Sequence, residues 1–353
     1  MRWWLPRIAL AISSVFIFLV GSELLVRGWH WVAHGTQRVN GQPAGLYANL
    51  RGEAPRLKPG AELNGLMYSV RVNSDGFRGE ELLQPKPRGG LRVWCVGGST
   101  TFDIYAPDDA AAWPAQAEAA LRRADPSRSI EVINAGVPGE ILMGSTESLL
   151  QRGRALGVDL VVVHHGPNDI RQLVDLPIID HRPPPWFSAF ELDIALRSWM
   201  QGRGLTAQRF AAQPFTRAHA DELRQRLNRL LRAIARVGAR PVFATHAARF
   251  GATTTGQALR AEVGELSAQW SMPPEDVRET LNGYNAVVTQ LANDWNVPLA
   301  DLRAVVPSEP RFWADASHFA APGSALAGEE VARAIQQALD PNRAAPAGVQ
   351  GSR

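Results

Sequence analysis

The sequence has 353 residues, 45% of them hydrophobic and 20% charged, which is enough for one large domain or two modest ones. Its formal net charge is only +3, and no basic block is interleaved with aromatic residues, so we expect no nucleic-acid partner. The single cysteine, Cys95, excludes an intrachain disulfide framework and a cysteine-based zinc site.

The N-terminus has the character of a membrane segment. Arg2 and Arg7 precede an uncharged stretch over residues 8–22, and tryptophans lie at both ends of the apolar region. Residues 3–26 together are long enough for one transmembrane helix with aromatic belts. No A-x-A cleavage site follows, which favours an anchor over residues 1–27 rather than a cleaved signal peptide. Either segment would place the rest of the chain outside the cytoplasm, in the periplasm or at the cell surface.

A linker is expected next, over residues 28–66, which are rich in Gly, Pro and Arg and lack sustained periodicity. The folded domain is predicted over residues 67–340. It begins with a short strand, in which Tyr68, Val70 and Val72 alternate on one face.

From residue 91 the chain alternates between strands and helices. The predicted strands are short and β-branched, as expected when both faces of a parallel sheet are buried. They cover residues 92–96, 131–134, 160–164, 241–245 and 298–302. The predicted helices cover residues 112–123, 144–156, 221–237, 274–295 and 323–339. This alternation predicts an α/β fold, a three-layer α/β/α sandwich with a five-stranded, mostly parallel sheet, whose functional groups gather at the carboxyl ends of the strands.

Residues 171–215 interrupt this alternation. A proline triplet precedes a run of aromatic and aliphatic residues at 186–200, which predicts an insertion that packs its own apolar cluster on the domain. The alternative interpretation is a lid or an acyl-chain surface near the site. Residues 341–353 are expected to form a disordered tail.

Four short motifs combine small and polar residues, and three of them stand at predicted strand ends. In chain order they are "GGST" at 97–100, "INAGVPGE" at 133–140, "VVVHHGPND" at 161–169 and "WADASHF" at 313–319. Their order resembles that of the SGNH (GDSL-like) hydrolase superfamily, over about residues 70–338 or roughly three quarters of the chain. The upstream segment "VNSDGFRG" at 72–79 is similar to one found in membrane-anchored bacterial members.

This resemblance implies a serine hydrolase, in which Ser99 matches the nucleophile and Asp315 and His318 match the acid and the base. The residue types suit these roles. A serine hydroxyl attacks an ester when a neighbouring base takes its proton, and the ordinary pKa of histidine lies near neutrality. Asp315 precedes His318 by three residues, so a single turn brings its carboxylate to the Nδ1–H of the ring.

The resemblance also implies an oxyanion hole, because attack on an ester creates a negative oxygen that needs preorganised donors. The donors would be the backbone N–H groups of Ser99 and Gly139 and the side-chain amide of Asn168. Gly136 is a less favoured alternative to Gly139. The chain departs from many members of the superfamily at Gly98, where they have Asp.

Two histidines at the ends of the third and fourth predicted strands, His165 and His246, are candidates for the substrate pocket. No pair of histidines has metal-ligand spacing with a supporting carboxylate, so we expect no metal. Neither a P-loop nor a G-x-G-x-x-G after a strand is present, and no cofactor is expected.

These features together predict a membrane-anchored, extracytoplasmic serine esterase that cleaves an acyl or O-acetyl ester through an acyl-enzyme. Its substrate would be a small molecule, a lipid or an acylated glycan. One alternative uses the same residues in an O-acyltransferase that acts on a glycan hydroxyl. Another is a non-catalytic binding or assembly protein on a degenerate hydrolase domain.

Overall fold

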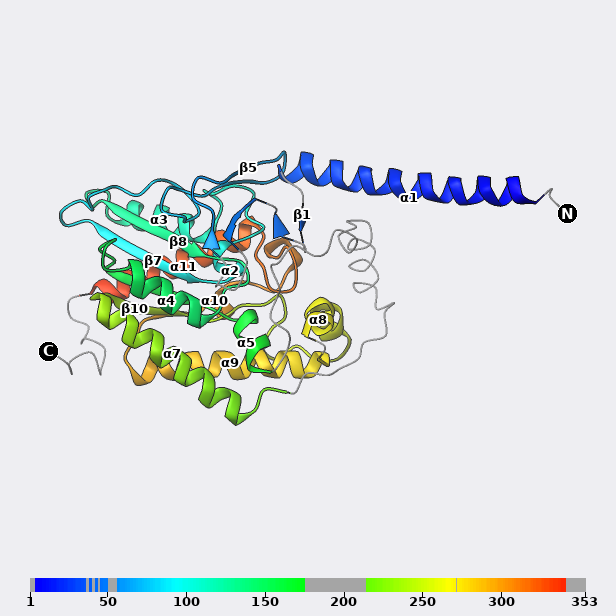
Figure 1. The fold of residues 1–353 in the computed structure, drawn as a ribbon. Coiled ribbons are helices and arrows are strands. Elements are labelled where there is room, and N and C mark those ends of the chain that lie inside the picture. Colours follow the sequence, from blue (N-terminus) through cyan, green and yellow to red (C-terminus); the bar gives the residue numbers. More distant parts are fainter. Residues whose placement is uncertain are drawn as a thin grey trace.

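The computed structural model describes residues 4–35, 38–39, 42–43, 45–49, 56–174, 214–270 and 272–340. Its first element is the 30-residue helix α1 (Leu5–His34), which projects away from the rest of the molecule (Figure 1). The helix is long and apolar enough to cross a membrane, and its apolar stretch is not buried. It continues past the expected end of the anchor at residue 27, and it stops at Gly35, which adopts a left-handed conformation with φ 70°.

A turn of the domain holds the last turn of α1. The carbonyls of Val32 and Ala33 accept hydrogen bonds from the N–H groups of Leu66 and Met67, each at 2.8 Å. Leu66 and Met67 lie between β5 (Glu62–Asn64) and β6 (Ser69–Arg71). The final carbonyls of a helix have no partner within the helix, so this turn satisfies two of them and joins α1 to the domain.

Short antiparallel strand pairs occupy much of the segment expected to be a linker. They are β1 (Arg38–Val39) with β2 (Gln42–Pro43), β3 (Tyr47–Asn49) with β4 (Arg56–Leu57), and β5 with β6. The short strand expected near the start of the domain is β6, and the three alternating residues Tyr68, Val70 and Val72 are buried together as predicted. They pack with Phe102, close to the first of the four motifs.

The centre of the molecule is a five-stranded sheet, as the sequence predicts. It consists of β7 (Leu91–Gly97), β8 (Ile130–Gly136), β9 (Leu160–His164), β10 (Arg240–Ala244) and β11 (Leu299–Ala300), in the order β11-β10-β9-β7-β8. Every neighbouring pair is parallel. All residues of β7 and β9 are buried, which explains why these strands are almost continuously apolar in the sequence.

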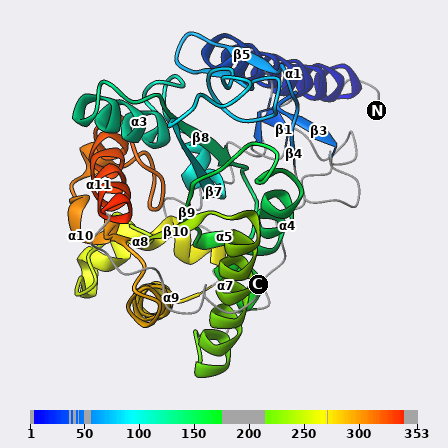
Figure 2. The ribbon, with the colours of Figure 1, turned by 90° about the vertical axis from the view of Figure 1, so that its left-hand side faces the viewer.

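Helices cover both faces of this sheet, so the three-layer α/β/α prediction is confirmed. One face carries α3 (Trp113–Ala124) and α11 (Ala321–Leu339), and the other carries α4 (Leu142–Arg152), α7 (Arg217–Val237) and α9 (Pro274–Asp294) (Figure 2). Alternate residues of β7 serve the two cores. Trp94 and Val96 pack toward α4, α7 and α9, whereas Val93 and Cys95 pack toward α3 and α11. Burial raises the pKa of the Cys95 thiol, as expected for an unreactive core residue.

Among the longer helices described, α8 (Gly256–Trp270), which packs against α9, was not expected. Its buried residues Leu259, Val263 and Leu266 have helical spacing, but Gly264 and the Gly- and Thr-rich stretch before the helix weaken the pattern. Apart from its two ends, the predicted insertion at 171–215 lies outside the described residues, as does the predicted tail at 341–353.

Candidate active site

Ser99 lies where the first motif leaves strand β7 of the sheet. It is the first residue of the short helix α2 (Ser99–Phe102) and is partly buried. Gly97, the last residue of β7, has no room for a side chain, because a Cβ would come within 2.1 Å of the carbonyl oxygen of His164. The glycine therefore allows the chain to turn tightly against β9 and to present Ser99 at the carboxyl edge of the sheet.

The last motif brings an imidazole to this serine across 219 positions of sequence. His318 and Asp315 belong to the loop between the 3-10 helix η2 (Pro310–Phe312) and α11. The Ser99 Oγ lies 2.8 Å from His318 Nε2, and His318 Nδ1 lies 2.7 Å from Asp315 Oδ2. The other Asp315 oxygen accepts hydrogen bonds from the backbone N–H groups of Ser317 and His318, each at 2.8 Å. The carboxylate thus fixes both the ring and the turn that carries it.

The surroundings of Asp315 keep it ionised. Burial by itself would raise the pKa of this carboxyl, but the neighbouring His318 and the hydrogen bonds from residues 317 and 318 outweigh burial and lower the pKa to about 2. Tyr105 packs edge-on against the His318 ring, with ring centroids 5.4 Å apart. When a hydroxyl, an imidazole and an ionised carboxylate are hydrogen-bonded in this order, the imidazole can activate the hydroxyl as a nucleophile.

The second and third motifs meet beside Ser99. Gly139 lies in the loop after β8 with φ 86°, a conformation that glycine adopts without strain. Asn168 lies at the start of α5 (Pro167–Leu173), and its Nδ2 donates to the carbonyl oxygen of Glu140 at 3.0 Å. An amide nitrogen carries two hydrogens, so this bond leaves the second one for another acceptor.

The same amide explains the glycine at position 98. A Cβ at Gly98 would lie 2.7 Å from Asn168 Nδ2, so any side chain there would displace the amide or be displaced by it. The backbone of Gly98 has φ −89°, which other residues also adopt, and its requirement for glycine is therefore a matter of space. Position 98, where many members of the superfamily have Asp, is therefore a glycine in a chain whose Asn168 amide lies close to the turn before Ser99.

The less favoured glycine of the second motif, Gly136, has a different position. It is buried at the end of β8, and a Cβ there would lie 2.1 Å from the backbone nitrogen of Phe102. Gly136 therefore allows α2 to pack directly on the end of the strand.

The two candidate pocket histidines are both buried, and each residue is 2% exposed. His165 bonds to Asp169 through Nδ1 and to Ser145 through Nε2. His246 stacks on His164, and neither of its ring nitrogens has a hydrogen-bond partner among the described residues. Burial lowers the pKa of His246 well below its ordinary value, which keeps this ring neutral. A contact of His165 or His246 with substrate stays a prediction.

Arg78 is an element of the site that sequence reasoning left without a role. Its guanidinium reaches the carboxylate of Asp109 at 2.9 Å and the carbonyl oxygens of Phe102 and Asp103 at 3.0 and 2.8 Å. It also bonds to two further carbonyls of the same loop, at residues 106 and 108. This loop follows α2 and carries Tyr105, so Arg78 supports the backbone behind Ser99. The signal in the sequence was its place in "VNSDGFRG".

No group of three or more His, Cys, Asp or Glu side chains in the described part of the chain is arranged to hold a metal ion.

Comparison with known proteins gives one match at the family level. The sequence profile of the GDSL-like lipase/acylhydrolase family matches residues 95–326, more than half of the chain. This range contains all four motifs, and with them Ser99, Asn168 and His318. A search of curated proteins found no match.

Several solved structures are similar to the chain at low sequence identity. LAE5, an α/β hydrolase from the metagenome of Lake Arreo, Spain, is 14% identical with a TM-score of 0.46, over 70% of this chain and 96% of its own. A GDSL-like lipase from Bacteroides thetaiotaomicron is 13% identical with a TM-score of 0.43, over 73% and 93%. The acetylxylan esterase Axe2 from Geobacillus stearothermophilus is 16% identical with a TM-score of 0.43, over 70% and 96%.

Proposed function

The chain belongs to the GDSL-like lipase/acylhydrolase family and is an ester-hydrolysing serine hydrolase, and we propose that it works through Ser99, His318 and Asp315 with an acyl-enzyme intermediate. The observation that carries this proposal is the continuous hydrogen-bonded chain from Ser99 Oγ through His318 to Asp315, with separations of 2.8 and 2.7 Å.

The reaction has two halves, which use the same base. In the first, His318 Nε2 takes the proton of Ser99 Oγ as the oxygen attacks the ester carbon, and it then gives that proton to the departing alcohol. In the second, His318 takes a proton from the water that attacks the acyl-serine ester, and it returns this proton to Ser99 Oγ as the acid leaves. Asp315 accepts the Nδ1–H of His318 throughout, so the ring keeps the tautomer that leaves Nε2 free as the base.

Three donors would stabilise the oxyanion of both tetrahedral intermediates. They are the backbone N–H groups of Ser99 and Gly139 and the second hydrogen of Asn168 Nδ2. The first hydrogen of that amide is held by Glu140, and this bond preorients the donor before substrate binds. Loss of one such donor typically lowers kcat by about 10²–10³.

We propose that α1 is an uncleaved anchor and that the domain lies outside the cytoplasm. The exposed apolar helix and the arginines before its apolar core support this arrangement. Deletion of residues 1–35 should move the protein from the membrane fraction to the soluble fraction of a disrupted cell. If the complete sequence is expressed and the purified protein lacks its N-terminal residues, the segment is instead a cleaved signal peptide.

Substitution of the nucleophile tests the mechanism. Ser99→Ala should lower kcat/KM for p-nitrophenyl acetate by about 10⁴-fold or more. Ser127→Ala, which removes an exposed hydroxyl far from the motifs, should retain full activity. A fluorophosphonate probe should label Ser99 in the folded protein. Full esterase activity of Ser99→Ala would overturn the proposal, and acyl transfer to an added glycan in preference to water would identify an O-acyltransferase.

A further inference from the structure

A second serine–histidine–aspartate chain lies behind the proposed oxyanion hole. Ser145 Oγ lies 3.0 Å from His165 Nε2, and His165 Nδ1 lies 2.9 Å from Asp169 Oδ2. The three residues are 4%, 2% and 0% exposed, respectively. Nothing in the mechanism described above uses them.

This buried chain connects the two loops that carry the proposed donors. Ser145 belongs to α4, just after the Gly139 loop, while His165 and Asp169 flank Asn168 at the end of β9 and the start of α5. The second oxygen of Asp169 accepts the backbone N–H of Leu142, the first residue of α4, at 2.8 Å. Asp169 therefore bonds to both loops, and we call this set of contacts between the Gly139 loop and the Asn168 loop the junction.

A third link joins the same loops, the bond from Asn168 Nδ2 to the Glu140 carbonyl. Gly139 and Asn168 are thus each next in sequence to a residue that the junction holds. Hydrogen bonds of buried polar groups are costly to leave unmade, so these bonds favour one arrangement of the two loops.

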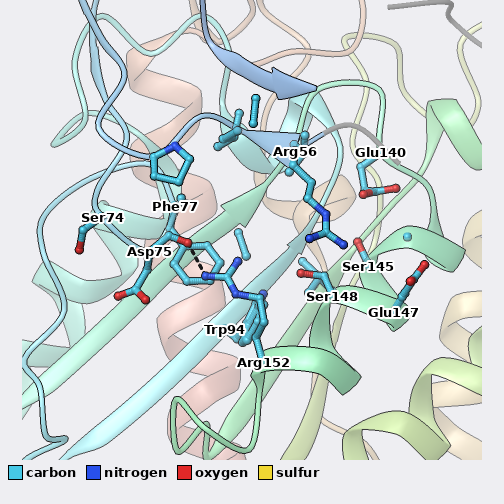
Figure 3. Close-up of a pocket in the computed structure, with 18 residues that line it drawn as sticks. Arg56, Ser74, Asp75, Phe77, Trp94, Glu140, Ser145, Glu147, Ser148 and Arg152 are labelled. Carbon is cyan, nitrogen blue, oxygen red and sulfur yellow. Dashed lines mark hydrogen bonds between the residues drawn. The ribbon is translucent and has the colours of Figure 1, made fainter. Parts of the chain in front are cut away.

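The position of Ser145 argues against a second nucleophile. Its own backbone N–H bonds to the Ile141 carbonyl at 3.2 Å, so that group is not free to stabilise an oxyanion. Ser145 and Glu140 also line a pocket of about 370 Å³, whose other polar residues include Arg56, Ser148 and Arg152. Figure 3 shows Arg56 reaching toward Glu140 and Ser145 across this pocket.

We propose that Asp169, held in place by His165 and Ser145, is a positioning residue that aligns the Gly139 and Asn168 donors on a common oxyanion. This inference rests on the proposed function, because it assigns Asp169 an effect only through those donors. Misplacement of a catalytic group by about 1 Å can lower a rate by about 10²-fold. Asp169→Asn should therefore lower kcat by about 10–10²-fold and change KM less than about twofold.

A double-mutant cycle distinguishes positioning from general destabilisation. Asn168→Ala should lower kcat by about 10²–10³ by removing a donor. If Asp169 acts by aligning the donors, the loss from Asp169→Asn should be smaller in the Asn168→Ala background, where only the Gly139 donor is left to misalign. Losses that multiply in full would overturn the proposal, as would an unchanged kcat in Asp169→Asn alone.

Three controls accompany the cycle, all in the full-length protein. Glu330→Gln alters a matched buried carboxylate that accepts the backbone N–H of Asp301 at 2.9 Å, and it should leave kcat unchanged. Ser145→Ala should lower kcat in the same direction as Asp169→Asn but by less, and an effect on thermal stability alone would count against the proposal. Ser99→Ala, labelled with a fluorophosphonate, should show no modification at Ser145.

Comparison of Ser99→Ala with Asp169→Asn separates the positioning role of Asp169 from the proposed catalytic mechanism. Loss of activity in Ser99→Ala with an unaffected Asp169→Asn would overturn the positioning role and leave the proposed mechanism intact. Activity that survives in Ser99→Ala would overturn the mechanism itself, and labelling of Ser145 would assign the second chain a catalytic role in place of a positioning one.

Discussion

Replacement of Glu140 by glutamine should make the unfolding free energy less sensitive to pH. The Glu140 side chain is 5% exposed, and burial raises the pKa of its carboxyl from 4.5 to about 7. The hydrogen bond from the backbone N–H of Ile141 and the nearby ring of His165 oppose this rise without cancelling it. The folded protein therefore binds the proton of Glu140 more tightly than the unfolded chain does.

The sign and size of the effect follow from this difference in proton binding. Between pH 4.5 and about 7 the folded state holds more protons, so its stability falls as pH rises through that range. A shift from 4.5 to about 7, at about 1.4 kcal/mol per pKa unit, corresponds to about 3 kcal/mol, most of which is lost between pH 5 and pH 8. Glutamine keeps the oxygen that accepts the Ile141 N–H and does not ionise, so Glu140→Gln should not lose this stability.

Urea unfolding of the full-length protein in detergent, followed by tryptophan fluorescence at pH 5 and pH 8, measures the difference. The advantage of Glu140→Gln over the parent protein should grow by about 2 to 3 kcal/mol between the two pH values, at an unchanged m-value. Glu309→Gln, which removes an exposed carboxylate, is the control. Its unfolding free energy relative to the parent protein should differ between pH 5 and pH 8 by less than about 0.5 kcal/mol. An advantage of Glu140→Gln that is equal at pH 5 and pH 8 would refute the reasoning.

Gly98→Ala should lower kcat by about 10–10²-fold with little change in KM, because its Cβ would displace the Asn168 amide, and unchanged steady-state kinetics would contradict this. The low pKa of Asp315, about 2, keeps it ionised, so kcat/KM should rise with pH as His318 loses its proton and becomes the base. Asp315→Asn should move the midpoint of this rise to lower pH, and a midpoint that stays or rises would argue against the ion pair. Arg78→Lys should lower the urea-unfolding free energy by about 3 kcal/mol, since lysine cannot reproduce the planar set of bonds to the loop after α2.

The sequence by itself determined the fold class and the order of its parts. Strands that are buried on both faces must be apolar almost throughout, so β7 and β9 are recognisable as short β-branched runs. Helix α7 is recognisable because its core face repeats at helical spacing. Asp315 and His318 are three residues apart, which made their contact predictable as a local turn.

Only the tertiary structure decided which distant groups touch. The contact of Ser99 with His318 depends on the strand order and on the loop before α11, neither of which is encoded in a local period. The glycine at position 98 could be explained only when the Asn168 amide was seen beside it. The sequence likewise had no means of pairing Ser145 with His165, because a buried hydrogen bond between two elements arises from their packing. Periodicity and turn chemistry act over a few residues, whereas the candidate active site is assembled from loops that the sheet brings to one edge.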